Sequence, residues 1–106
     1  MKLITKAIEK KAQKQYPMGS DMNQMVVAKF FDPCGGWTWY LMNQDPNDTN
    51  YLWGIVKGIY IEMGSFSLNE LQAYRGRLGI GIERDKFFKP MKAKDVYNAL
   101  MEGEHI

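Results

Sequence analysis

Residues 25–42 read MVVAKFFDPCGGWTWYLM, and this stretch decides the fold. Residues 25–31 are β-branched and aromatic, and the segment after them alternates Trp37, Trp39 and Leu41 with side chains that point the other way. Residues 32–36 between them contain one proline and two glycines, which suit a tight reversal because glycine adopts positive φ at little steric cost. The stretch therefore predicts an antiparallel hairpin.

Two longer helices are predicted outside this hairpin. Apolar side chains recur every four residues over residues 6–16, after Thr5 as the N-terminal cap and before Pro17 as the stop. Residues 94–102 show the same kind of spacing and are followed by Gly103, which suits a helix end. Both segments are expected to pack one apolar face on the sheet.

A shorter helix is predicted by the capping box Ser67-Leu68-Asn69-Glu70. The Ser67 hydroxyl is expected to accept from the third helical amide while the Glu70 side chain reaches back to the amide of the cap. Gly76 is expected to end this helix in the left-handed conformation.

Two further strands complete the predicted sheet. Residues 51–62 predict one long strand, bent where Gly54 and Gly58 interrupt it, because glycine inside a strand marks a bulge or a close backbone approach. Residues 79–88 predict a shorter strand. The resulting order favours an α+β fold with an antiparallel sheet of about four strands and three helices.

Length and composition limit the class of protein. The chain has 106 residues and a mass of 12.3 kDa, a size at which we expect a single domain over residues 1–106. Its hydrophobic share of 45% and charged share of 25% exclude disordered and disulfide-scaffold classes. No apolar run is long enough for a membrane span or a signal core, and a lone Cys34 fits a reducing compartment. We expect a cytoplasmic protein without a membrane partner.

The sequence offers little for catalysis or cofactor binding. The single histidine, His105, lies next to the last residue, which disfavours a histidine-based triad, and Cys34 is the only thiol that it could join at a metal. The glycines of residues 76–81 follow a predicted helix and precede a strand, which is the reverse of a dinucleotide-binding loop. We therefore expect no metal, no cofactor and no catalytic residue.

The formal net charge of +2 conceals two basic blocks. Residues 1–16 carry five lysines against one glutamate, and residues 75–94 carry seven basic side chains against two acidic ones. If the fold brings them together, the blocks suit a nucleic-acid backbone, and if it does not, they are solvated surface.

The aromatic residues of the hairpin allow two interpretations. Trp37, Trp39 and Tyr40 form either one face of the core or a set of rings on which nucleic-acid bases stack. The sequence leaves both open.

Three consecutive charges, Glu83, Arg84 and Asp85, stand between apolar residues in the second basic block. They form either a structural ion-pair set, with Arg75 or Arg77 as further members, or a recognition point at which an arginine binds a carboxylate or a phosphate. All five are candidate binding residues.

Several segments resemble a small bacterial domain-of-unknown-function family carried largely on plasmids, conjugative elements and phages. They are residues 25–33, 37–40, 64–71 and 79–90. Members of that family tend to be encoded near antirestriction, DNA-methylation and DNA-transfer genes, so the resemblance implies a role in element maintenance or defence evasion. Position 77 is often proline in that family and is Arg77 here.

Three functional hypotheses follow. The first is a non-catalytic accessory protein of a mobile element that binds a host or element-encoded protein, since aromatic and methionine side chains suit adaptable contact surfaces. The second is a nucleic-acid-binding module that uses residues 1–16 and 75–94 with the hairpin aromatics. The third is a small enzyme acting on nucleic acid or nucleotide through Glu83, Asp85 and the arginines.

Overall fold

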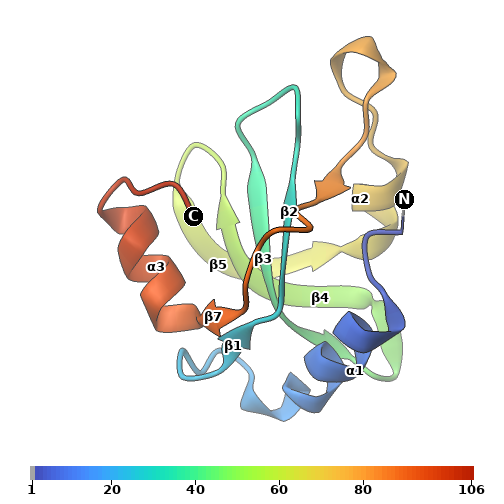
Figure 1. Cartoon of the computed structure of the whole chain (residues 1–106). Coiled ribbons are helices and arrows are strands. Elements are labelled where there is room, and N and C mark those ends of the chain that lie inside the picture. The colour runs from blue at the N-terminus through green and yellow to red at the C-terminus, as the bar shows by residue number, and fades with distance from the viewer. Residues whose placement is uncertain (1) are drawn as a thin grey trace.

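The computed structural model describes residues 2–106, and its centre is a five-stranded antiparallel sheet (Figure 1). Across the sheet the strands run in the order β5 (Ile61–Ser67), β4 (Asp48–Lys57), β3 (Thr38–Asp45), β2 (Ala28–Phe31) and β6 (Glu83–Arg84). A second, two-stranded antiparallel sheet joins β1 (Met25–Val26) to β7 (Met91–Lys92). The α+β class is confirmed, and the strand number is higher than the four expected.

The hairpin predicted from residues 25–42 is present as β2 and β3. Phe30 pairs with Trp39, and the Asp32 amide donates to the Trp37 carbonyl at 3.1 Å to close the turn. The first part of the expected strand separates as β1, which pairs with β7. The local turn chemistry was therefore sufficient to predict this reversal.

The single bent strand expected over residues 51–62 is wrong, because it is two strands, β4 and β5. Lys57 pairs with Ile61, and the Gly58 amide donates to the Tyr60 carbonyl at 3.0 Å across the turn between them. The turn contains Ile59 and Tyr60, whose side chains are typical of a strand, and this hid the reversal.

Gly54 marks a close approach between two backbones, as the sequence predicted. A Cβ at Gly54 would lie 1.9 Å from the Tyr40 carbonyl oxygen, next to the register shift between Leu41 and Asn43 of β3. Only glycine fits at this position of the central strand pair.

Of the strand expected over residues 79–88, only β6 is present, and it pairs with β2. Beyond it, the Phe87 amide donates to the Asp85 carboxylate at 2.9 Å and the chain turns away. Gly76 is not the left-handed helix stop that we expected, since its φ is −87° and the positive φ angles of this loop are at Leu78 and Gly79.

Three α-helices and two 3-10 turns complete the fold. The helices are α1 (Lys6–Lys14), α2 (Leu68–Ala73) and α3 (Ala93–Met101), and the turns are η1 (Tyr16–Met18) and η2 (Arg77–Gly79). Thr5 caps α1 and Ser67 caps α2 through side-chain oxygens, as predicted, and Gly103 follows α3 with a φ of +80°. No helix in residues 2–106 is long and apolar enough to cross a membrane.

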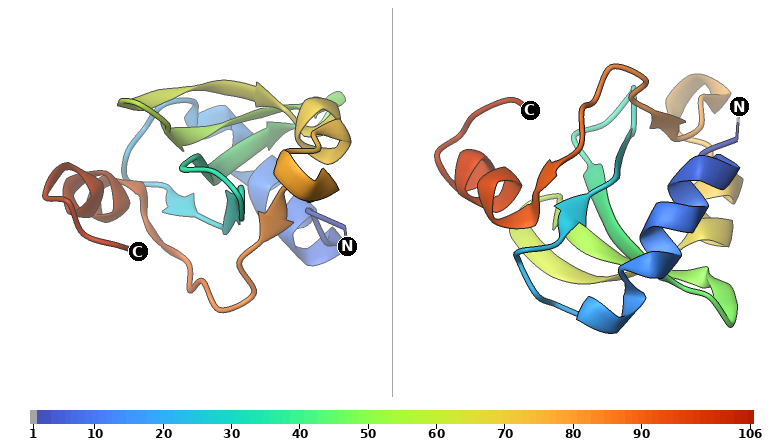
Figure 2. Two further views of the ribbon diagram at one scale, coloured as in Figure 1. Left: turned by 90° about the horizontal axis from the view of Figure 1, so that it is seen from above. Right: turned by 60° about the horizontal axis from the view of Figure 1, so that its bottom comes forward.

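The sheet separates two hydrophobic cores. Leu41 belongs to the first core, which α1 and α2 cover. Its neighbour Tyr40 points to the second core, under α3, because side chains alternate along a strand. Figure 2 shows α3 on one side of the strands and α1 and α2 on the other. This division decides which hairpin side chains can share one surface.

Candidate functional site

A cleft lies between the β2–β3 hairpin and α2, which stand next to each other in Figure 2. Its volume is about 300 Å³, at the lower end of the range for ligand pockets. Four aromatic rings and two carboxylates line it. We call it the aromatic cleft, and its lining residues are Asp32, Trp37, Trp39, Phe66, Ser67, Glu70, Leu71, Tyr74 and Ile82.

The floor of the aromatic cleft is the outer surface of the first core. Leu71 is buried in that core, and Trp39, Phe66 and Ile82 pack against it. Because packed core side chains keep their rotamers, the floor has a defined shape before any ligand arrives. Trp37 and Tyr74 are each 45% exposed and stand at the entrance.

The two tryptophans form one wall of the cleft. Their ring centroids are 6.2 Å apart with an interplanar angle of 29°, a stacked arrangement. The Trp37 ring also covers Gly58, where a Cβ would lie 2.5 Å from the ring. The wall is therefore held from the hairpin below and from the β4–β5 turn beside it.

Asp32 places a buried carboxylate in the cleft. The residue is only 8% exposed, and its Oδ1 accepts from the Cys34 amide at 3.0 Å in the turn. The negative charge of the nearby Asp32 raises the pKa of Tyr74. Asp32 thus faces the cleft from the β2–β3 turn while Tyr74 faces it from the end of α2.

Glu70 supplies the second carboxylate, and here the capping-box prediction is only half confirmed. The Glu70 amide donates to the Ser67 hydroxyl at 3.1 Å, and that hydroxyl in turn donates to Asn50 at 2.9 Å. Within residues 2–106 no hydrogen bond returns from the Glu70 side chain to the cap, and the side chain instead lines the cleft.

The aromatic cleft contains no basic lining residue. Over the described chain, the one ion pair joins Lys29 to Asp85 at 3.6 Å, so neither Asp32 nor Glu70 has a cationic partner. A cleft with aromatic walls and two carboxylates without counter-ions is suited to a positively charged ligand.

The structure separates Tyr40 from the two tryptophans. Tyr40 is 2% exposed and belongs to the second core, where its hydroxyl donates to the Ile106 carbonyl at 3.1 Å. Of the two interpretations left open for the hairpin aromatics, Tyr40 therefore fits the core and not a stacking surface beside Trp37 and Trp39, because adjacent side chains of a strand point to opposite faces.

Arg75 and Arg77 lie in the loop after α2. Arg75 donates through Nη1 to the carbonyls of Gln72 and Tyr74 at 2.8 and 2.7 Å, so its guanidinium closes the end of the helix. Arg77 is exposed in η2. Neither residue lines the aromatic cleft.

The three consecutive charges line one open cleft of about 440 Å³, but Arg84 and Asp85 are engaged in different contacts. Arg84 Nη1 donates to the carbonyls of Lys2 and Leu3 at 2.6 and 2.9 Å, and Asp85 pairs with Lys29. Glu83 pairs with Phe31 in the sheet. These contacts favour the structural interpretation for Arg84 and Asp85.

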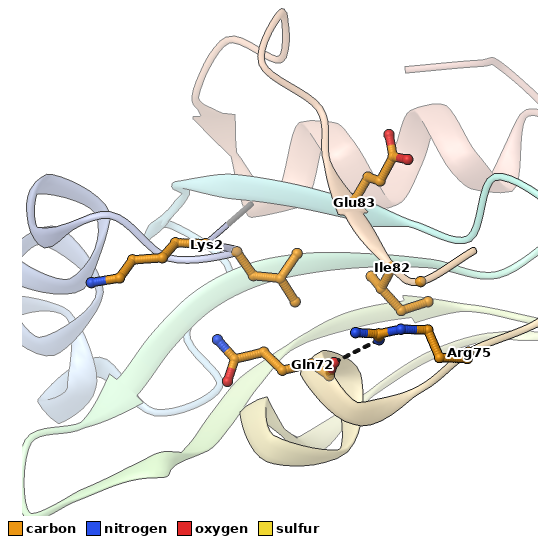
Figure 3. A pocket seen from close by; sticks show the side chains of 7 residues that line it. Lys2, Gln72, Arg75, Ile82 and Glu83 are labelled. Atoms are coloured by element: carbon orange, nitrogen blue, oxygen red, sulfur yellow. Dashed lines mark hydrogen bonds between the residues drawn. The ribbon is translucent and has the colours of Figure 1, made fainter. Parts of the chain in front are cut away.

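A second, more open cleft of about 440 Å³ adjoins the aromatic cleft at Ile82, and Figure 3 shows its lining. The guanidinium of Arg75 turns to the backbone of α2, while the side chains of Lys2 and Glu83 point away from Arg75. The charges of this cleft therefore do not converge on one point.

The two basic blocks do meet. Arg84, in the second block, holds the backbone of Lys2 and Leu3 in the first. A depression beside α1 is lined by residues of both blocks, among them Lys11, Lys14 and Pro90. The tryptophans lie elsewhere, in the acidic aromatic cleft, so the basic region and the exposed rings are separate surfaces.

Sequence reasoning found the tryptophans but missed the rest of the cleft. It placed Asp32 in the hairpin turn and Glu70 in the capping box, and it assigned no site role to Tyr74. The signal that was present is the Asp-Pro turn directly before Trp37, which puts a carboxylate beside an aromatic pair. What placed α2 against the hairpin is tertiary packing of Leu71, which no local pattern contains.

Comparison with known proteins gives one family. Residues 1–104 match the family model described as "Protein of unknown function (DUF2958)". Neither the curated proteins nor the solved structures contain a match to this chain. In residues 2–106, no group of three or more His, Cys, Asp or Glu side chains is arranged to hold a metal ion. Since the family model covers nearly the whole chain, the protein belongs to the DUF2958 family, whose function is unknown.

Proposed function

We propose that this protein is a non-catalytic accessory protein that binds another protein through the aromatic cleft. The observation that carries the proposal is the cleft itself, which has a packed apolar floor, half-exposed Trp37 and Tyr74 at its entrance, and the carboxylates of Asp32 and Glu70. Tryptophan and tyrosine dominate the binding energy of protein interfaces because they bury large rigid surfaces in such pockets.

The surroundings of the cleft support the same proposal. The turn that the Trp37 ring covers exposes Ile59 by 84% and Tyr60 by 73%. Single exposed apolar residues are common, but two beside an aromatic cleft extend it into a larger contact surface.

The contacts of the charged residues support binding over catalysis. Arg75 and Arg84 are engaged with main-chain carbonyls, and Asp85 is paired with Lys29. Groups held in this way are not free to act together as acid, base or phosphate ligand. The catalytic hypothesis would therefore have to break the contacts of Arg84 and Asp85 before these side chains could act with Glu83 in the cleft that all three line.

The proposed biological setting is the maintenance of a plasmid, conjugative element or phage, or its evasion of host defence, with a host or element-encoded partner. This part of the proposal rests on the family resemblance described from the sequence. A partner is therefore to be sought in a lysate of bacterial cells that carry such an element.

Affinity capture from a host lysate tests the proposed function. Wild-type protein is expected to retain a stoichiometric partner that Trp37→Ala loses, because the substitution removes the entrance ring. Phe87→Ala is the matched control, since Phe87 is 92% exposed and lies outside the cleft. Equal recovery by Trp37→Ala and wild type would place the binding surface elsewhere.

Nucleic-acid binding is the second candidate, favoured by the contact of Arg84 with the Lys2 backbone, which joins the two basic blocks, and by the lysines of the depression beside α1. Lys11 and Lys14 are both exposed there and can contact a phosphate backbone. In the described chain no aromatic side chain lines this depression, so we rank nucleic-acid binding below protein binding.

Fluorescence anisotropy with single- and double-stranded oligonucleotides at two salt concentrations tests this candidate. Binding that weakens steeply with salt and is lost in a Lys11→Glu, Lys14→Glu variant would support it. No binding at low salt would exclude it.

A further inference from the structure

We propose that the aromatic cleft binds an arginine side chain presented by the partner protein. This inference rests on the proposed function and names the chemistry that the site recognises. It is carried by three features of the cleft: its charge, the geometry of its rings and its size.

The charge of the cleft selects a cation. Asp32 is buried, lines the cleft and has no cationic partner in the described chain, and Glu70 adds a second carboxylate at the exposed rim. A buried carboxylate is costly unless it is paired or well hydrogen-bonded, and the Asp32 carboxylate accepts from the neutral Cys34 amide. An incoming cation would give the Asp32 carboxylate the cationic partner that it lacks in the described chain.

The rings select a flat cation. Trp37 offers a half-exposed indole face that is fixed by Trp39 behind it and by Gly58 beside it. A guanidinium stacks on an indole and at the same time donates in its own plane to a carboxylate, which the compact ammonium of lysine does less well. Tyr74, which is also 45% exposed, lines the same cleft.

The size of the cleft selects a side chain rather than a larger ligand. Its volume of about 300 Å³ is small for a drug-sized molecule, and its apolar floor suits the methylene stem of an arginine. The exposed Ile59 and Tyr60 beside it are placed to contact the chain that presents this arginine.

The test uses the full chain and two probes of the same shape. N-acetyl-arginine amide carries a guanidinium, and N-acetyl-citrulline amide replaces it with a neutral urea. In a two-dimensional ¹H–¹⁵N NMR titration, the arginine probe is expected to shift the indole N–H signals of Trp37 and Trp39 and the amides of Asp32 and Tyr74. The citrulline probe is expected to bind at least about fivefold more weakly.

Charge-removing variants complete the design. Glu70→Gln is expected to weaken the arginine probe by about two- to fivefold and leave the citrulline probe unchanged, while Glu62→Gln, at an exposed carboxylate outside the cleft, changes neither. The α2 cap survives in Glu70→Gln because it uses the main-chain amide. Equal binding of the two probes, or shifts confined to residues outside the cleft, would overturn the inference.

The result is separable from the proposed function. Loss of the captured partner in Trp37→Ala together with equal binding of the two probes would keep protein binding and reject arginine recognition. Arginine-selective binding with a partner that Trp37→Ala retains would keep the ligand chemistry and reject the cleft as the partner's site.

Discussion

The ring of Trp37 covers Gly58 so closely that a Cβ at position 58 would lie 2.5 Å from two of the ring carbons. The contact ties the β2–β3 turn to the β4–β5 turn, although 21 positions separate the two residues in the chain. It holds one wall of the aromatic cleft, since Trp37 also stacks on Trp39. The shape of the cleft thus depends on a glycine outside its lining.

Gly58→Ala is expected to displace the Trp37 ring while changing stability little, because the ring is the mobile end of a half-exposed side chain. The near-ultraviolet circular dichroism of the tryptophan pair and the capture of the partner are expected to decrease together. Gly64→Ala, where a Cβ meets no atom within 4 Å, is the control and should change neither. An unchanged tryptophan spectrum in Gly58→Ala would contradict this contact.

Gly54→Ala is expected to destabilise the whole fold. Its Cβ would meet the Tyr40 carbonyl oxygen at 1.9 Å, and backbone of the central strands cannot move aside as a side chain can. We expect a loss of at least about 3 kcal/mol in the free energy of unfolding, measured by urea denaturation. Gly64, which pairs with Gly54 across the sheet, provides the comparison, and similar losses for the two alanine variants would contradict the account.

Arg84→Ala is expected to lower the free energy of unfolding by about 1–3 kcal/mol, because Arg84 donates to the carbonyls of Lys2 and Leu3 and so holds the buried Leu3 in the first core. Arg77→Ala removes the same charge from an exposed position and should stay within about 0.5 kcal/mol of wild type. Urea denaturation of both variants makes the comparison. Equal effects would mean that charge rather than the anchoring contact matters.

The buried Tyr40 side chain is expected to make the folded protein less stable at alkaline pH. Burial, with a contribution from the charge of Asp85, raises the pKa of Tyr40 from 10.0 to about 12. Below pH 10 the phenol is protonated in both states and its contribution is fully present. Between pH 10 and pH 12 the unfolded chain loses the proton first, so the free energy of unfolding falls by about 2–3 kcal/mol in total.

Tyr40→Phe removes this alkaline loss. The variant is expected to be about 1 kcal/mol less stable at pH 8, since the hydrogen bond to the Ile106 carbonyl is lost, and to lose about 2 kcal/mol less than wild type on going from pH 8 to pH 11.5. Urea denaturation at the two pH values measures both quantities. An equal loss in wild type and variant would contradict the assignment.

Local chemistry explains which parts of the fold the sequence could predict. Thr5 and Ser67 cap helices through contacts within three residues, and the Pro-Cys-Gly-Gly turn of residues 33–36 forms the hairpin without distant help. The turn at Gly58 escaped prediction because Ile59 and Tyr60 have strand-forming side chains and find no strand partner there.

The candidate site was predictable only in part, and for a physical reason. The alternation along residues 37–42 predicted that Trp37 and Trp39 share one side of the hairpin and that Tyr40 points to the other, and the two cores confirm this for Trp39 and Tyr40. Asp32 and Tyr74 are 42 positions apart and meet because α2 packs on the hairpin through Leu71. Such a contact comes from tertiary packing and has no local sequence signature.

Site-specific photocrosslinking in host cells tests the central claim most directly, because it reports where the partner lies. The photoreactive residue p-benzoylphenylalanine would replace Tyr60, which is 73% exposed beside the cleft, or Met101, which is 59% exposed on α3. The account predicts one covalent adduct of defined mass from position 60, lost when Trp37→Ala is added, and none from position 101. An adduct from position 101 and none from position 60 would contradict it.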